Sequence, residues 1–318
     1  MSGQIRINEA YCVELGRTVS ITEARRAYFS LPAPRARFTF QCPDSGCLAL
    51  DEPPTITGVN YSSLPTDTYR AAHFRDPGVG HAVDCPWQAD EATTDIAPAS
   101  EAETKDREAK RKLHDFINEF DPAPAGRQVG TQDVGGADTD RLAQNRRGDM
   151  GVGKGESFTN RNRTKSFERL VEYYRNAAEL DKEEFFSLQL KVAGEGEMPL
   201  ISYFPNVSKA HPGQPKRVIH GGARLEPRKD AGFMLWFMDR IDGKGVYLKV
   251  TNQEMEAYRF RGYFNDTLAQ ETADYFRIFA LGRVVLSETG KSYRLEVQDL
   301  NHLTLYAVTK KQPDEQGG

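Results

Sequence analysis

Apolar and polar residues alternate along several stretches in the second half of the chain, and a period of two is typical of β-strands with one buried face. The clearest runs read FFSLQLKV, GFMLWFMDRI and VYLKVT, at residues 185–192, 232–241 and 246–251. Two closing strands are expected within residues 292–308. Asp-Gly-Lys-Gly at 242–245 predicts a hairpin turn between two of these strands, because Asp-Gly suits a tight turn.

Other stretches carry apolar residues at the spacing of a helix. Residues 165–180 predict an amphipathic helix. Residues 266–281 also suit a helix, and Gly282 follows as a C-cap. Residues 101–120 predict a charged helix with a thin apolar stripe.

The first ninety residues lack long apolar runs and predict a small, loop-rich module. Residues 18–29 predict a short strand that enters a helix, with Thr22 as the N-cap. Residues 36–42 alternate and predict a strand that leads to Cys42. The following CLALD, at 47–51, suits a return strand.

These patterns divide the chain into four segments. We expect a module at residues 1–95, a charged helix and flexible linker at 96–155, a β-rich α+β domain at 156–310 and a disordered tail at 311–318. The expected fold class is therefore α+β, with a small N-terminal module and a mixed β-sheet domain with flanking helices.

Composition and charge narrow the classes of function. No run of 18 apolar residues exists and the N-terminus lacks the apolar core of a secretory signal, so we expect a cytoplasmic protein with no membrane partner. The formal net charge of −4 argues against indiscriminate coating of nucleic acid. The first hundred residues hold 8 Lys and Arg against 12 Asp and Glu, which makes that part a poor surface for phosphate.

Three of the four cysteines gather with two histidines in one short stretch of the chain. Without an export signal, reduced thiols are expected, and such a cluster indicates metal ligation. A turn with Pro and Gly separates Cys42 from Cys47, and His81 and Cys85 have the spacing of one helical turn. A Cys₃His set is common at structural zinc sites. We predict a structural zinc held by Cys42, Cys47, His81 and Cys85, with His73 as an alternative ligand.

The same residues carry a resemblance to a known family. In order, the chain reads GRTVSITEA, FTFQCPDSGC, AHFR and HAVDC. Over about residues 10–87 this series resembles the N-terminal zinc-associated module of competence CoiA-like proteins and related proteins of prokaryotic DNA metabolism and defence. The chain departs from that pattern in the longer spacing of its cysteine pair and in Asp76, which replaces the second His of an HF-x-H element. These departures suggest that His81 and Cys85 take over ligation.

The resemblance also implies an alternative function, because the family often couples this module to a nuclease domain. A PD-(D/E)xK-like nuclease site would use Gln189 and Lys191 on a strand, with Glu168 or Glu172 as the distant acid. An ordinary strand with Gln and Lys on its polar face gives the same pattern.

Basic residues cluster at 159–170 and at 211–229. Aromatic residues lie on strands predicted nearby: Tyr203, Phe204, Trp236, Tyr247 and Tyr258. Basic loops beside exposed aromatics are typical of proteins that bind single-stranded nucleic acid. A solvated charge run over a packed aromatic core gives the same sequence. The candidate contacts to nucleic acid are Arg161, Arg163, Lys165, Lys216 and Arg217.

The sequence thus predicts a non-enzymatic zinc-binding protein with a β-rich binding domain. We expect a protein partner in a larger complex, and DNA or RNA as a partner of residues 156–310. The resemblance implies a setting of prokaryotic DNA metabolism, mobile elements or anti-phage defence. The alternatives are a metal-dependent nuclease and a purely structural subunit.

Overall fold

A computed structural model of the 318-residue chain describes eight stretches of the sequence. These are residues 7, 9–66, 72–78, 80–83, 85, 87, 117–122 and 163–309. The chain forms two compact units, residues 1–99 with 200–318 and residues 100–199. Most of the predicted linker and all of the predicted tail lie outside the described residues, and the predicted domain boundaries stay predictions. Helices and several β-sheets occur together, which confirms the α+β class.

The N-terminal part of the first unit contains an antiparallel five-stranded sheet in the order β2-β1-β3-β4-β5. Its strands are β1 (Glu9–Cys12), β2 (Arg17–Ser20), β3 (Phe40–Gln41), β4 (Thr55–Val59) and β5 (His73–Arg75). Helix α1 (Ile21–Ser30) follows β2, and the hydroxyl of Ser20 caps it by accepting from the Glu23 N–H. The N-cap is therefore Ser20, and the prediction of Thr22 is wrong because the helix begins two residues earlier, at Ile21.

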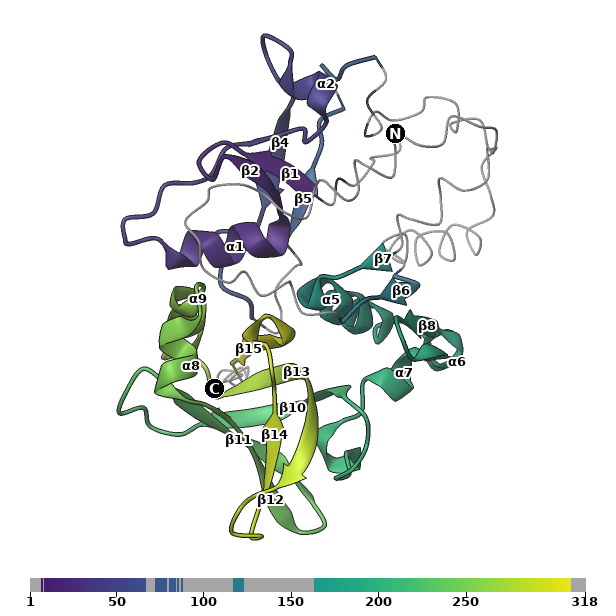
Figure 1. Cartoon of the computed structure of the whole chain (residues 1–318), viewed down its shortest axis with the longest axis vertical. Coiled ribbons are helices and arrows are strands. Elements are labelled where there is room, and N and C mark those ends of the chain that lie inside the picture. The colour runs from purple at the N-terminus through teal and green to yellow at the C-terminus, as the bar shows by residue number, and fades with distance from the viewer. Residues whose placement is uncertain are drawn as a thin grey trace, which may run out of the picture. The chain divides into compact units, whose positions relative to one another are not determined.

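The C-terminal part of the first unit is a β-barrel with two helices, as Figure 1 shows in green and yellow. It begins with short helical turns, α7 (Leu200–Tyr203) and η3 (Val207–Lys209). The strands are β10 (Arg217–Leu225), β11 (Phe233–Ile241), β12 (Lys244–Val250), β13 (Tyr275–Leu286), β14 (Tyr293–Glu296) and β15 (Leu303–Val308). Helices α8 (Asn252–Ala257) and α9 (Arg261–Leu268) connect β12 to β13, and η4 (Leu300–His302) precedes β15.

The strand pairing closes five of these strands into a barrel. The order is β10-β11-β12-β14-β13, and β13 pairs back onto β10. All pairs are antiparallel except β12 with β14, which is parallel. This order, with a helical connection between the third and fourth strands, is the connectivity of the OB-fold, a five-stranded Greek-key barrel. Strand β15 pairs with the first part of β13, Tyr275–Ala280, before the residues of β13 that pair with β14.

The barrel interior is filled by alternate residues of each strand. Inward-facing side chains include Leu235, Leu248, Ile278, Leu295 and Leu305, all buried in one cluster. The intervening residues of β11, β12 and β14 point outward, because neighbouring side chains on a strand face opposite sides. The hairpin predicted at 242–245 is confirmed: Asp242 and Gly243 both adopt positive φ, at 47° and 75°, as a two-residue type I′ turn requires.

Helix α1 of the N-terminal part packs against α9 of the barrel, and its Phe29 enters the barrel core. Gly262 permits this close approach, because a Cβ there would lie 2.4 Å from the carbonyl oxygen of Phe29. Further along the chain, the Pro65 carbonyl accepts a hydrogen bond from the Ala307 N–H of β15. The N-terminal part is thus built onto the barrel at two places.

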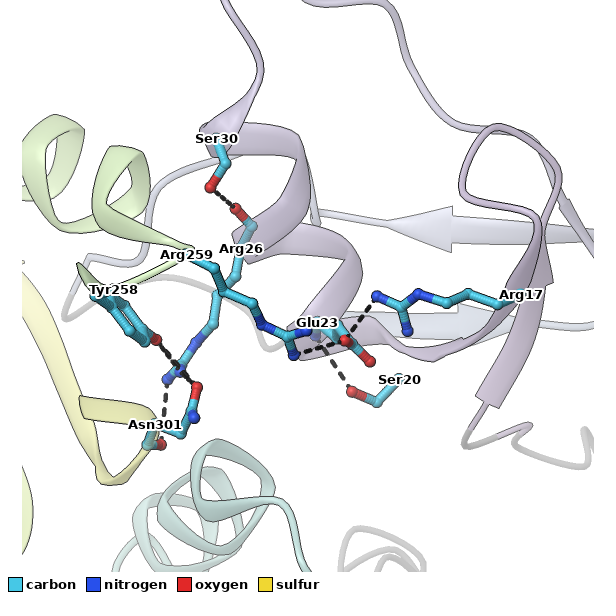
Figure 2. A network of polar contacts seen from close by, with 8 residues as sticks. All are labelled: Arg17, Ser20, Glu23, Arg26, Ser30, Tyr258, Arg259 and Asn301. Atoms are coloured by element: carbon cyan, nitrogen blue, oxygen red, sulfur yellow. Dashed lines mark hydrogen bonds and ion pairs between the residues drawn. The ribbon is translucent and has the colours of Figure 1, made fainter. Parts of the chain in front are cut away.

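A network of polar contacts reinforces this packing (Figure 2). Arg26 on α1 is buried, and its guanidinium donates to the Tyr258 hydroxyl at 2.7 Å and to Asn301 Oδ1 at 3.1 Å. The same group donates to the backbone carbonyls of Asn301 and Leu303. On the exposed side, Glu23 pairs with Arg17 at 2.8 Å and with Arg259 at 3.0 Å.

The second unit contains a small mixed sheet in the order β7-β6-β8-β9. Its elements are β6 (Glu119–Phe120), β7 (Arg163–Thr164), α5 (Phe167–Ala177), α6 (Lys182–Ser187), β8 (Gln189–Val192) and β9 (Gly196–Pro199). The amphipathic helix predicted at 165–180 is confirmed as α5. The strand predicted at 185–192 is confirmed only from Gln189, because Asp181 caps a helix that includes Phe185 and Phe186.

Two other predictions of secondary structure are wrong, and a third is wrong where the structure describes it: within the charged helix expected at 101–120, Glu119–Phe120 form strand β6. The expected return strand at 47–51 falls on α2 (Ser45–Leu48) and the turn after it, since Asp44 caps a short helix. The expected helix at 266–281 ends at Leu268, and the rest is the long strand β13. Gly282 is not a C-cap but a position inside β13, where a Cβ would lie 2.2 Å from the Glu296 carbonyl oxygen. None of the helices in the described part of the chain has the length and apolar character needed to cross a bilayer.

Candidate metal centre

Four ligand-capable side chains converge at one end of the N-terminal sheet. Cys42 follows β3, Cys47 lies on α2, and His81 and Cys85 belong to the loop after β5. One ligand atom from each of the four lies within 4.8 Å of all the others. The structure therefore brings together the four residues that the sequence selected as a set able to hold a metal ion.

The distances between the ligand atoms suit a tetrahedral ion. Cys42 Sγ lies 3.7 Å from Cys85 Sγ. His81 Nδ1 lies 3.5 Å from Cys47 Sγ and 3.3 Å from Cys85 Sγ. Zinc bonds of about 2.3 Å to sulfur and about 2.0 Å to nitrogen, at tetrahedral angles, would put two sulfurs about 3.8 Å apart and a nitrogen about 3.5 Å from a sulfur. The ligand atoms thus already stand close to the spacing that zinc requires.

Local hydrogen bonds fix the cysteine pair. The Asp44 carboxylate caps α2 by accepting from the N–H groups of Gly46 and Cys47, at 2.9 Å and 3.2 Å. The resulting helical turn carries Cys47 back towards Cys42, whose own N–H donates to the Pro54 carbonyl. The Ala82 N–H donates to Cys47 Sγ at 3.3 Å, which stabilises negative charge on that sulfur.

His81 is oriented by a buried carboxylate. Its Nε2, the ring nitrogen that faces away from the sulfurs, lies 2.9 Å from Asp76 Oδ2, and both side chains are almost fully buried. The other Asp76 oxygen accepts from the Gly78 N–H at 2.8 Å. A carboxylate on the far nitrogen of a metal-ligating histidine fixes its tautomer and orientation and makes it a stronger ligand. Asp76 is thus positioned to hold His81 so that its Nδ1 can bind a metal ion.

The structure separates His73 from the four-residue group. Its side chain is exposed on β5, whereas the neighbouring Phe74 points into the core. The group found among the described residues comprises Cys42, Cys47, His81 and Cys85. In place of the predicted helical turn, His81 and Cys85 are joined by a tight turn in which the Cys85 N–H donates to the Ala82 carbonyl.

Burial governs the thiol chemistry of this group. Cys42 and Cys47 are fully buried, Cys85 is nearly so, and Trp87 packs against them. Burial raises the pKa of the Cys42 and Cys85 thiols, because a thiolate loses its hydration there. A divalent cation reverses this preference, since metal coordination deprotonates thiols. The sulfurs are therefore arranged to become thiolates when an ion binds.

Asp76→Asn is expected to weaken metal binding without removing a ligand. Loss of the carboxylate charge beside His81 Nε2 should lower zinc affinity by about 10–100-fold. The measurement is competition with a chromophoric chelator. His73→Ala is the control, because the exposed His73 lies outside the group, and it should leave zinc affinity unchanged. A loss in His73→Ala as large as that in Asp76→Asn would contradict the separation of His73 from the site.

The predicted nucleic-acid contacts fall on different compact units. Lys165 is exposed in the second unit, and Arg163 lies on β7 beside it, while Arg161 lies outside the described residues. In the first unit, Lys216 Nζ donates to Gln298 Oε1, and Arg217 lies over the Tyr203 ring. Each of these two groups is therefore described only within its own unit.

The residues of the alternative nuclease site lie in the second unit. Gln189 and Lys191 are exposed on β8, and Lys191 Nζ pairs with Glu119 Oε2 of β6 at 3.1 Å. Glu168 is buried on α5, and Glu172 is partly buried there. Within the part of the chain that the structure describes, the Cys₃His set is the one group of three or more His, Cys, Asp or Glu side chains close enough to hold an ion.

Comparison with known proteins gives no relative for this chain: no family model, curated protein or solved structure matches it. The resemblance to the CoiA-like module stays a prediction from the sequence.

Proposed function

We propose that this chain is a non-enzymatic binding protein whose N-terminal part is held together by one structural zinc ion. The observation that carries the proposal is the Cys₃His set, whose ligand atoms stand at tetrahedral spacing in a buried position. Three thiolates with one imidazole are a usual ligand set for structural zinc. The ion would tie α2 and the loop after β5 to the end of β3.

Several features favour a structural over a catalytic role. A catalytic zinc keeps a position open for water, whereas a closed structural site fills all four with protein ligands. Here four protein ligands are present, and the carboxylate of Asp76 is engaged by His81 and Gly78. Trp87 also packs against the cysteines. Among the described residues of the site, the Asp76 carboxylate is thus occupied by other contacts.

The binding activity is proposed for the barrel, with nucleic acid as the ligand. The support is its OB-fold connectivity, which is used repeatedly for oligonucleotides and oligosaccharides. Because a fold alone does not fix a function, the side chains on the barrel surface must supply the contacts to the ligand. The resemblance to CoiA-like proteins adds the proposed setting of prokaryotic DNA metabolism, mobile elements or defence.

Cobalt substitution is expected to distinguish a closed site from an open one. Co²⁺ in place of zinc should give the intense visible absorption of a tetrahedral thiolate complex. Added azide should leave this spectrum unchanged, because no coordination position is free. A spectrum that shifts with azide would show an open position and contradict the structural role.

The binding activity has a separate test. The full chain should retard single-stranded oligonucleotides in a gel-shift experiment, with an affinity that falls steeply as salt is raised. It should leave them intact with Mg²⁺ or Mn²⁺. Cleavage that is lost in Lys191→Ala would instead support the nuclease alternative.

A further inference from the structure

A row of four outward-facing side chains crosses the barrel surface. Strand register places Arg224 of β10 opposite Trp236 of β11, Trp236 opposite Tyr247 of β12, and Tyr247 opposite Arg294 of β14. On each strand the next residues point into the core. Two aromatic rings therefore lie side by side between two arginines, and we call these four residues the aromatic row.

The aromatic pair is held in place and is accessible to solvent. The rings of Trp236 and Tyr247 lie 5.0 Å apart between centroids, at an angle of 45°. The indole N–H donates to Glu226 Oε2 at 2.9 Å, which fixes the orientation of the ring. The indole lies over Gly245, where a Cβ would be only 3.2 Å from Cζ3. Trp236 nevertheless remains 38 % exposed.

Beside the aromatic row lie a further exposed apolar side chain and a further cation. Met238, the next outward residue after Trp236 along β11, is 49 % exposed and lies above Gly222, where no side chain intervenes. Lys249, two residues beyond Tyr247, is exposed on the same face. Large exposed apolar side chains at the centre of a polar surface mark interaction sites.

The charges on this face favour an anionic ligand at the ends of the row. Arg224, Lys249 and Arg240 are exposed cations, and Arg294 forms an ion pair with Glu296. The acidic groups near the row include Glu226, Asp239, Glu288 and Glu296. Glu226 and Glu296 are already engaged, by the indole N–H and by arginines. Arg224 and Arg294 therefore flank the two rings, one at each end of the row.

We propose that the aromatic row is the binding site for single-stranded nucleic acid, with bases stacked on Trp236 and Tyr247 and phosphates contacted by Arg224 and Arg294. Exposed bases of a single strand supply π-faces that stack on aromatic rings, and its backbone supplies the anions. A duplex hides those faces in its own stack. The site lies on the second and third strands of the barrel, the face on which OB-folds bind oligonucleotides. This inference rests on the proposed binding function and names its site, which differs from the basic clusters selected by sequence.

The test measures binding of fluorescent dT and U oligonucleotides by the zinc-loaded full chain, using fluorescence anisotropy over a salt series. Trp236→Ala should weaken binding about tenfold or more, because stacking of a base on an aromatic ring contributes on that scale. Trp236→Phe should retain most of the affinity. Phe186→Ala, which removes an even more exposed aromatic ring (55 %) from α6, should have no effect. Loss of Arg224 or Arg294 should reduce the salt slope by about 0.7 each.

A second readout follows the indole directly. The chain has two tryptophans, so a Trp87→Phe variant leaves Trp236 as the sole indole, and stacking of a base should quench its fluorescence. Binding that Trp236→Ala leaves unchanged would overturn this site while the binding function stands. No binding of any strand would overturn both. Equal affinity for duplex DNA, or loss of a protein partner rather than of oligonucleotides in Trp236→Ala, would also overturn the proposal.

Discussion

Cys42→Ser is expected to lower zinc affinity by more than about 100-fold, since it removes a ligand, and loss of a supporting group alone costs about 10–100-fold. Because zinc binding and folding are coupled in small sites, the N-terminal sheet and α2 should lose stability together with the ion. Cys42 connects the site to β3, the central strand of that sheet. Thermal unfolding with and without a chelator measures the effect.

Cys12→Ser is the matched control for this experiment. Cys12 is equally buried, in the apolar cluster of the same sheet, and is not a member of the four-residue group. Burial raises its pKa to about 11, as expected for an inert thiol. Cys12→Ser should destabilise the fold modestly but keep the zinc and the response to chelator. A chelator response that persists in Cys42→Ser would contradict the ligand assignment.

Arg26→Ala is expected to destabilise the first unit by about 3 kcal/mol or more. The buried guanidinium donates to Tyr258, Asn301 and the Leu303 carbonyl, and hydrogen bonds to a charged group contribute about 1.5–3 kcal/mol each. Truncation would leave these acceptors, among them the buried Leu303 carbonyl, without this donor. The melting temperature should fall by on the order of 5–10 °C.

Arg17→Ala provides the comparison for this second prediction, because Arg17 belongs to the same network at its exposed end (Figure 2). An exposed ion pair contributes about 0–1 kcal/mol, so the melting temperature should hardly move. Similar losses in the two variants would mean that the buried contacts of Arg26 do not hold α1 on the barrel. Chemical denaturation of both variants would settle the comparison.

The four candidate metal ligands could be predicted from the sequence because each pair of them lies close together in the chain. Cys42 and Cys47 share one turn, and His81 and Cys85 share another, so spacing and residue type identified both pairs. The role of Asp76 was not predictable in the same way. It depends on where the loop after β5 places His81, and the only sequence signal was that Asp76 takes a histidine's position in the family pattern.

The strand β13 shows where hydrophobic periodicity fails. Nearly all of its residues from Phe276 to Val284 are buried on either face. Alternation is then lost, and a continuous apolar run fits a helix as well as a strand. By contrast, β11 alternates buried with exposed residues and was predicted correctly.

The closure of the barrel and the packing of α1 against it could not be predicted from the sequence, for a different reason. Both depend on contacts between residues far apart in the chain, such as Arg26 with Asn301, 275 residues away. Local propensity carries no information about such pairings. The aromatic row likewise arises only when four strands are aligned in register, because Arg224 and Arg294 are ordinary polar positions of their own strands.

The zinc site is tested most directly by the metal content of the chain. Native mass spectrometry measures it on freshly purified protein and again after denaturation. We predict one zinc ion per chain in the native protein, lost on denaturation and absent from Cys42→Ser. A native mass equal to that of the bare chain, in protein that is folded and unresponsive to chelator, would contradict the central claim that zinc holds Cys42, Cys47, His81 and Cys85 together.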